Sequence, residues 1–463
     1  MTKIDFFFKP KSIAIIGASD TKRFGYTTTN YLLKSKFKTF PVHLYKSEIL
    51  GHKAYQNIKD IPEKIELAII MVANNQVLQA VKDCAEKGVN GIIIESAGFA
   101  ETGEEKYIKI QNEILRIAKE MNIRIIGPNC VGLTNFNNKF TSAEVDFNNA
   151  LEGRVSVIAQ SGVLGNVFID WAAAQRIGFS KAITLGNKID VDEVDMLDYL
   201  NNDPDTNVIT LYLEGTKRGK EFKQILKQMT KPVLILKNGR SESGSNAVKS
   251  HTASIAGNDK IYEAIIRQCR GIFRVNNFYE MFNIAHVFST QPLPKGKNIA
   301  VITGSGSLGI LACDEIERQG LYIAKLSEET IQKIKAVIPN WVSIDGTIDL
   351  GPSQGTSLVP SFKAIMKDDN VHSLLYIFCI PRGPLEQFKQ LSVLVESYFR
   401  LMMKLSKKTN KPCICVCFGS HWVFDYVLKI ASKFKIPVMT RIKHAIKAFK
   451  MMHEYGNTLK NRY

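Results

Sequence analysis

The sequence predicts an α/β protein made of three Rossmann-like or flavodoxin-like domains, each with a parallel sheet. Three apolar stretches run into glycine turns, and they begin at Ser12, Arg154 and Asn298. Their spacing is close to the usual size of a domain, and the 463-residue length fits about three such units. Between these starts, short continuous apolar runs alternate with helical stretches. This alternation is typical of parallel strands that helices cover on both faces.

The domains are expected at residues 1–140, 145–290 and 297–463. Residues 291–297 read Gln-Pro-Leu-Pro-Lys-Gly-Lys, a composition that is typical of a linker. The apolar runs expected to be strands are residues 13–16, 65–72, 91–95 and 123–126 in the first domain, 208–213 and 233–236 in the second, and 374–380 and 413–418 in the third. Residues 77–87 and 107–122 are expected to be helices.

Charge and composition narrow the function classes. The chain has 61 Lys and Arg against 44 Asp and Glu, a net charge of +17. This excess favours anionic partners, although lysine spread over solvated faces would produce it as well. No nucleic-acid-binding signature and no apolar run of about 20 residues is present, so neither a nucleic-acid partner nor a membrane span is expected. Lys9 and Lys11 interrupt the first apolar stretch, which argues against a signal peptide, and eight cysteines fit a reducing cytoplasm.

The glycine loops are weak signals when each is taken alone. Residues 304–309 fit Gly-x-Gly-x-x-Gly, but residues 322–325 stand where a nicotinamide site needs a carboxylate for the ribose. A turn that lets a strand and a helix pack is therefore favoured there. In the first loop, Lys22 and Arg23 follow Gly17, which suits the phosphates of an adenine-nucleotide ligand.

The most informative segment lies in the second predicted domain. A buried strand ends at Lys237, a loop rich in Ser and Gly follows, and Ser250-His251-Thr252 precedes an Ala/Ile helix. Free backbone N–H groups and the positive end of a helix disfavour an imidazolium there and favour an added anion. His251 is therefore a candidate neutral histidine that accepts a phosphoryl group. A helix cap on the surface is the alternative interpretation.

A histidine nucleophile also needs one ring nitrogen held as N–H, and a carboxylate usually holds it. Glu214 is the candidate, because it directly follows the apolar strand 208–213. The sites of α/β proteins lie at this carboxyl end of the strands. An ion-paired strand end is the alternative.

These residues resemble a known family. Residues 231–257 are similar to the phosphohistidine loop of the ADP-forming acyl-CoA synthetases, relatives of succinyl-CoA synthetase, except that Ala253 replaces the usual glycine. Residues 7–19 resemble the start of that family's CoA-binding domain, and residues 96–103 and 127–132 match two further motifs of it. Gln160-Ser161-Gly162 and the residues up to Gly165 resemble the phosphate loop of its second domain.

The resemblance implies a three-part alpha subunit without a metal site of its own. The first domain would bind CoA rather than NAD, and the third resembles the ligase-CoA domain of the family. The implied catalytic residues are His251 and Glu214, and the implied phosphate-binding residues are Ser161, Gly162, Ser250 and Thr252. The implied CoA-binding residues are Gly17, Ala18, Ser19, Arg23, Gly25, Ser96, Ala97, Gly98, Phe99 and Asn129.

The implied reaction is acyl-CoA + phosphate + ADP ⇌ acid + CoA + ATP, through an acyl phosphate and a phosphohistidine, with acetate as the default acid. ADP or ATP and Mg²⁺ would bind an ATP-grasp beta subunit, in an assembly of two alpha and two beta chains. A non-catalytic CoA-binding scaffold stays open as an alternative, because Ala253 and residues 304–309 and 346–351 depart from the family pattern. A nicotinamide-dependent oxidoreductase is the third possibility, and the missing ribose carboxylates argue against it.

The cysteines are expected to have structural roles. Cys413, Cys415 and Cys417 alternate along an apolar strand and therefore share one face, which favours a buried strand over a metal site. For Cys130, packing or a place near CoA is favoured over a nucleophile.

Overall fold

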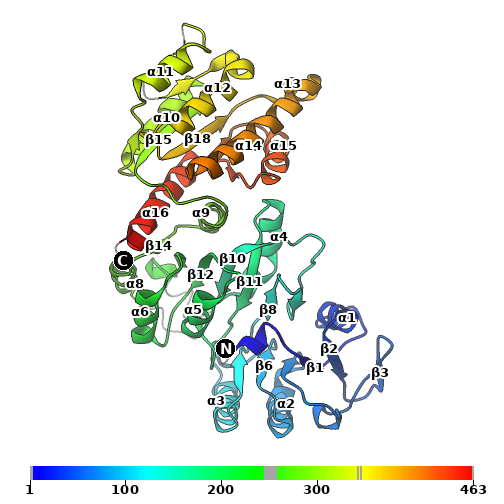
Figure 1. The fold of residues 1–463 in the computed structure, drawn as a ribbon. Helices are drawn as coiled ribbons and strands as arrows, with labels where there is room; N and C mark the ends of the chain where they lie inside the picture. Colours follow the sequence, from blue (N-terminus) through cyan, green and yellow to red (C-terminus); the bar gives the residue numbers. More distant parts are fainter. Residues whose placement is uncertain (1–3, 245–257, 341, 343, 345–346, 461–463) are drawn as a thin grey trace. The chain divides into compact units, whose positions relative to one another are not determined.

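The computed structural model describes residues 4–244, 258–340, 342, 344 and 347–460. The chain divides into two compact units, Met1–Asn276 and Asn277–Tyr463 (Figure 1). Each unit has its own sheets and hydrophobic core, and each is described here by itself. Among the described residues, no helix is long and apolar enough to cross a membrane.

The first sheet of the first unit has five parallel strands in the order β2-β1-β5-β6-β7. The strands β1, β5 and β6 are buried along their whole length, which explains their continuous apolar sequences. Side chains of α2 and α3 share a core with one face of the sheet, and those of α1 share a core with the other. The bounds are β1 Ser12–Ile16, α1 Tyr26–Lys34, β2 Lys38–Val42, β5 Leu67–Ile70, α2 Asn74–Lys87, β6 Gly91–Ile94, α3 Glu105–Glu120 and β7 Arg124–Ile126, with a hairpin of β3 Glu48–Ile49 and β4 His52–Lys53.

The second sheet of this unit has seven strands in the order β14-β13-β12-β10-β11-β8-β9. Five strands are parallel, but β8 and β9 form an antiparallel extension beside β11. The sequence did not reveal this extension, because strands of two or three residues are too short to show a pattern. The bounds are β8 Leu133–Asn135, β9 Phe140–Thr141, β10 Glu152–Ala159, α4 Val167–Ala174, β11 Phe179–Thr184, α5 Glu193–Asn202, β12 Val208–Leu213, α6 Gly219–Gln228, β13 Val233–Lys237, α8 Asp259–Gln268 and β14 Ile272–Arg274.

The two sheets of the first unit share one hydrophobic core. Ile13 and Ile69 of the first sheet belong to the same buried cluster as Ile183 and Leu211 of the second. The ring of Phe8, which precedes β1, stacks on Tyr199 of α5 at 4.4 Å between centroids. Residues after the strands of both sheets are therefore held in fixed positions relative to one another.

The second unit contains one parallel sheet in the order β16-β15-β18-β19-β20, with β17 beside β15. Helices α12, α14 and α15 pack together, and α16 packs against α9 and α10 (Figure 1). The side chains of Cys413, Cys415 and Cys417 are buried in the cluster formed with α12, α14 and α15, which confirms the prediction of a buried strand. The bounds are α9 Phe278–Thr290, β15 Asn298–Thr303, α10 Gly306–Arg318, β16 Tyr322–Ile323, α11 Glu328–Lys335, β17 Ile348–Asp349, α12 Gln354–Lys367, β18 Ser373–Phe378, α13 Arg382–Gln387, α14 Lys389–Thr409, β19 Cys413–Cys417, α15 His421–Ser432, β20 Val438–Met439 and α16 Ile442–Lys460.

Candidate functional site

A cavity of about 860 Å³ opens at the carboxyl ends of strands β1, β2 and β5. The chain passes from β1 to β2 on one side of β1 and then crosses to β5 on its other side, and open α/β sheets bind ligands where the strand order reverses in this way. Gly17 and Arg23, two of the residues expected to bind CoA, line the cavity. Other residues, which were not among those expected to bind CoA, also line it, among them His43, Lys46, Asn57 and Asp83.

The rim of this cavity carries charged and polar side chains. The ammonium of Lys46 donates to both carboxylate oxygens of Asp20 at 2.6 Å. The Nδ1 atom of His43 accepts the backbone N–H groups of Tyr45 and Lys46, each at 3.2 Å. Burial, followed by the charge of Lys46, lowers the pKa of His43, so its imidazole is neutral at pH 7. The cations that line the cavity are therefore Lys46, which is paired with Asp20, and the exposed Arg23.

The other residues expected to bind CoA do not line this cavity, and several hold the neighbouring loops together. The N–H of Ser19 donates to Thr29 Oγ1 at 3.2 Å, and Ser96 Oγ donates to the carbonyl of Val72 at 2.5 Å. The N–H of Gly98 donates to a carboxylate oxygen of Glu101 at 2.6 Å. The residues of this group are Ala18, Ser19, Gly25, Ser96, Ala97, Gly98, Phe99 and Asn129.

Glu214 lies directly after β12, at the carboxyl edge of the second sheet, as expected from the sequence. Its side chain is buried, with 4% of its surface exposed. The hydroxyl of Tyr212 donates to Glu214 Oε1 at 3.3 Å, and Asn238, which follows β13, donates to the same hydroxyl at 2.9 Å. The carboxylate is therefore held between the ends of two adjacent parallel strands.

Gln160 joins Glu214 to the predicted phosphate loop. Its Oε1 atom accepts the N–H groups of Glu214 and Gly215 at 3.1 and 3.3 Å, and the next residues in the chain are Ser161 and Gly162. A Cβ at Gly162 would lie 2.5 Å from Cγ2 of Val131, so glycine allows this close approach. The structure thus brings Glu214, Ser161 and Gly162 to one edge of the sheet.

The helix after this loop does not begin directly at Gly162. A 3₁₀ turn spans Gly162–Gly165, and α4 starts only at Val167. The side chain of Asn166 caps α4 by accepting the N–H of Val167 at 2.7 Å. The backbone groups nearest to Ser161 therefore belong to the 3₁₀ turn rather than to the first turn of α4.

The remaining predicted residues, Ser250, His251 and Thr252, lie outside the described residues, and so does Ala253. The chain enters that segment after β13 and leaves it into α8. At the end of β13 the ammonium of the buried Lys237 lies 4.8 Å from the ring centroid of Tyr262, and burial lowers the pKa of this lysine. Within the described part of the chain, no group of three or more His, Cys, Asp and Glu residues is arranged to hold a metal ion.

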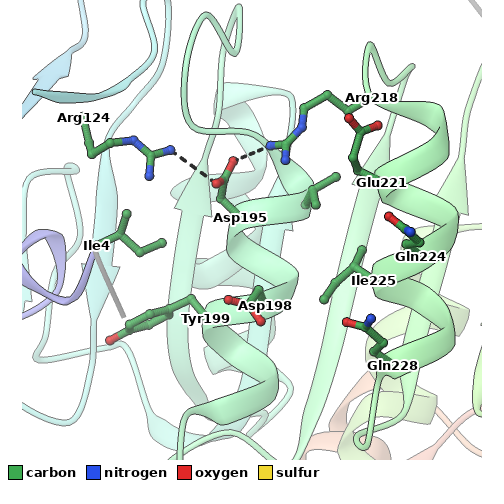
Figure 2. A pocket seen from close by; sticks show the side chains of 11 residues that line it. Ile4, Arg124, Asp195, Asp198, Tyr199, Arg218, Glu221, Gln224, Ile225 and Gln228 are labelled. Atoms are coloured by element: carbon green, nitrogen blue, oxygen red, sulfur yellow. Dashed lines mark hydrogen bonds and ion pairs between the residues drawn. The ribbon is translucent and has the colours of Figure 1, made fainter. Parts of the chain in front are cut away.

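A second cavity of about 400 Å³ lies between α5 and α6. Figure 2 shows Asp195 between the guanidinium groups of Arg124 and Arg218, with N–O distances of 3.3 and 2.9 Å. Arg124 belongs to β7 of the first sheet and also pairs with Asp190 at 2.9 Å. None of the predicted site residues lines this cavity. Three of its charged side chains, Arg124, Asp195 and Arg218, are paired with one another, and Arg124 links the two sheets.

Asp192, beside this cavity, leads to a prediction about pH. It caps α5 by accepting the N–H of Val194 at 2.8 Å, and burial, followed by the charges of Glu193 and Asp195, raises its pKa to about 7. The folded state then holds a proton between pH 4 and 7 that the unfolded state has released, so this group makes the free energy of unfolding fall as the pH rises through that range. Between pH 5 and pH 8 the expected fall from this group is about 2 kcal/mol.

Asp192→Asn keeps a side chain that can cap α5 but cannot ionise. The variant is therefore expected to lose less stability than the parent protein between pH 5 and pH 8. Urea unfolding at both pH values measures the difference, and titrating groups distant from Asp192 contribute equally to the two proteins. An identical fall in the parent and the variant would show that Asp192 does not titrate in this range.

Two family models match consecutive parts of the chain, the first over the five-stranded sheet and the second from β10 into α9. A family model described as a CoA binding domain matches residues 11–135, and one described as a succinyl-CoA ligase like flavodoxin domain matches residues 152–288. The chain is 40% identical over 383 residues to subunit alpha of ADP-forming acetate–CoA ligase II from Pyrococcus furiosus. That match covers 82% of this chain and 83% of the relative.

Two further comparisons cover nearly the whole chain. An ADP-forming acetate–CoA ligase II from Archaeoglobus fulgidus is 35% identical over 97% of this chain, which spans 66% of that relative. A solved structure of acetyl-coenzyme A synthetase 1 from Candidatus Korarchaeum cryptofilum, in complex with phosphate and ADP, superposes with a TM-score of 0.88. It is 28% identical, and the match covers 99% of this chain and 98% of that one. The chain therefore belongs to the family of ADP-forming acetate–CoA ligases.

Proposed function

We propose that this chain is the alpha subunit of an ADP-forming acid–CoA ligase that interconverts acyl-CoA, phosphate and ADP with acid, CoA and ATP. The observation that carries the proposal is the junction at Gln160, which binds the backbone of Glu214 and directly precedes Ser161 and Gly162. Transfer of a phosphoryl group through a histidine requires a carboxylate of this kind beside a phosphate loop. Acetate is the proposed acid, in keeping with the names of the relatives.

The proposed reaction has three steps. An oxygen of inorganic phosphate attacks the thioester carbonyl of the acyl-CoA, the C–S bond breaks, and CoA leaves as the thiolate. A ring nitrogen of His251 then attacks the phosphorus of the acyl phosphate, and the carboxylate of the acid leaves with the electrons of the P–O bond. Finally, an oxygen of ADP takes the phosphoryl group from the histidine, which produces ATP and restores the neutral ring.

The chain's own residues have distinct proposed roles in these steps. Glu214 would hold the other ring nitrogen of His251 as N–H and stabilise the positive charge that develops on the imidazole. Ser161 and the backbone N–H groups of the Gly162–Gly165 turn, with Ser250 and Thr252, would bind the phosphate oxygens as their charge shifts. The cavity between Gly17 and Lys46 would hold the nucleotide part of CoA.

The proposal also assigns the nucleotide site to a partner of this chain. ADP or ATP and Mg²⁺ would bind an ATP-grasp beta subunit, because a 40% identical relative is itself named a subunit alpha. Two alpha and two beta chains with closed symmetry are the proposed assembly, in the cytoplasm. No nucleic-acid or membrane partner is proposed. The alternative, a CoA-binding scaffold without turnover, predicts that CoA binds while no phosphoryl group is transferred.

An assay of ATP synthesis tests the proposed function. The purified chain is supplied with acetyl-CoA, ADP, phosphate and Mg²⁺, once alone and once with its ATP-grasp partner. We expect sustained ATP production only in the mixture, because phosphorylation of ADP requires the nucleotide site on the partner. Sustained ATP production by the chain alone would contradict the assignment of the nucleotide site to the partner. CoA binding without ATP production in the mixture would favour the scaffold.

A further inference from the structure

One turn of the second sheet contacts both the CoA motifs and the residues proposed for phosphoryl transfer. Residues 185–188 follow β11, and the N–H of Lys188 donates to the carbonyl of Leu185 at 3.2 Å. Gly186 has a φ of +56°, and a Cβ there would lie 2.2 Å from the carbonyl oxygen of Pro128. A glycine at this position therefore lets the 185–188 turn lie directly against residues 127–132, one of the CoA motifs.

Asn187 connects the 185–188 turn to the CoA motifs. Its backbone N–H donates to the carbonyl of Pro128 at 2.9 Å. Its side-chain amide donates to Glu101 Oε2 at 2.6 Å and to Gln111 Oε1 at 2.9 Å. The other oxygen of Glu101 accepts the N–H of Gly98. Asn187 therefore holds both motif segments, residues 96–103 and 127–132, at the same time.

Lys188 connects the same turn to the phosphoryl-transfer residues. Its ammonium is buried, with 7% of the residue exposed, and donates to Gln160 Oε1 at 3.2 Å, Gly215 O at 2.7 Å and Glu193 Oε2 at 2.8 Å. All three donors of the ammonium are thereby used. Gln160 in turn accepts the N–H of Glu214. One buried cation therefore joins the ends of β10 and β12.

We propose that Lys188 is a positioning residue for phosphoryl transfer and that Asn187, the residue before it, is a positioning residue for CoA. The 185–188 turn would then set the placement of the thioester relative to the phosphate loop. Charge-assisted hydrogen bonds in a buried site hold their partners more firmly than neutral bonds do. Reactions of this kind are sensitive to displacements of about 1 Å, which cost about 100-fold in rate. The inference rests on the proposed function.

Removing the charge of Lys188 needs a compensating change. Lys188→Met alone would leave the fully buried carboxylate of Glu193 without its cation, which destabilises a fold. The double variant Lys188→Met/Glu193→Gln removes both charges together. The matched control is Lys109→Met/Glu105→Gln, which removes an exposed ion pair on α3. Asn187→Ala tests the CoA side of the turn.

The experiment measures two quantities on the full chain, with thermal melting to confirm folding. The first is the rate at which acetyl phosphate forms base-stable phosphohistidine, and the second is the Kd for CoA from calorimetric titration. We expect the Lys188 double variant to form phosphohistidine about 100-fold more slowly with a CoA Kd within about twofold of the parent. Asn187→Ala is expected to raise the Kd for CoA about tenfold with a smaller effect on the phosphorylation rate. The control pair should change neither.

The outcomes separate this inference from the proposed function. An unlabelled parent chain would overturn the proposed function and the inference together. If the parent chain is labelled and the Lys188 double variant forms phosphohistidine equally fast, the inference alone is overturned. The same holds if the double variant changes the phosphorylation rate and the Kd for CoA by equal factors. Failure of the double variant to fold would assign the buried pair a purely structural role and would likewise overturn it.

Discussion

Replacement of His251 by asparagine is expected to reduce ATP synthesis by the complete enzyme to background. Asparagine is polar and of similar size, but its amide nitrogen has no lone pair available to attack phosphorus. The variant should also show no acid-labile, base-stable phosphate after mixing with ATP and Mg²⁺. CoA binding should be unchanged, because the cavity that we assign to CoA lies in the first sheet.

A histidine elsewhere in the chain supplies the control for this variant. His421 is exposed at the start of α15, in the second unit. His421→Asn should retain full phosphorylation and ATP synthesis. Full labelling of His251→Asn would show that another residue carries the phosphoryl group.

Glu214→Gln is expected to slow phosphohistidine formation severely while the fold stays intact. An amide of the same shape can still accept the hydroxyl of Tyr212, and the contact of Gln160 with the backbone of residue 214 does not depend on the side chain. An amide orients an imidazole N–H less firmly and does not stabilise its positive charge. Loss of the comparable carboxylate in a serine-protease triad lowers turnover by about 10⁴, and we take this as the upper bound.

Rapid-quench measurement of the phosphorylation rate tests this expectation. Glu221→Gln, which removes the charge of the exposed Glu221 in the first turn of α6, is the matched control and should react at the parental rate. An unchanged rate in Glu214→Gln would mean that a different residue orients the ring of His251.

Much of the fold could be predicted because buried parallel strands have a direct sequence signal. Strands β1, β5, β6, β12 and β19 are continuous apolar runs that are buried on both faces, so their sequences alone identify them. Strand β2 was not identified, because its sequence is Lys-Thr-Phe-Pro-Val and its first residues are partly exposed. His43 and Lys46, which follow β2, line the cavity that we assign to CoA and were not among the residues expected to bind CoA.

The supporting residues of the site had no sequence signal of their own. Lys188 and Asn187 are single polar residues whose role depends on partners far along the chain, and Gln160 was recognised only as part of the phosphate-loop motif. Lys188 reaches Gly215, 27 residues away, and Asn187 reaches Glu101, 86 residues away. Glu214 could be proposed because a charge at the end of an apolar strand is itself unusual. Sequence reasoning therefore identified the residue at the strand end but not the residues that hold it there.

The most direct test of the account is to locate the phosphoryl group on the working enzyme. The chain and its partner are mixed with acetyl-CoA and phosphate without ADP, quenched in base, and mapped by mass spectrometry. The account predicts phosphate on the peptide that contains His251, and loss of that phosphate when ADP and Mg²⁺ are added before the quench. ATP synthesis without any phosphate on that peptide, or with the phosphate on another residue, would contradict it.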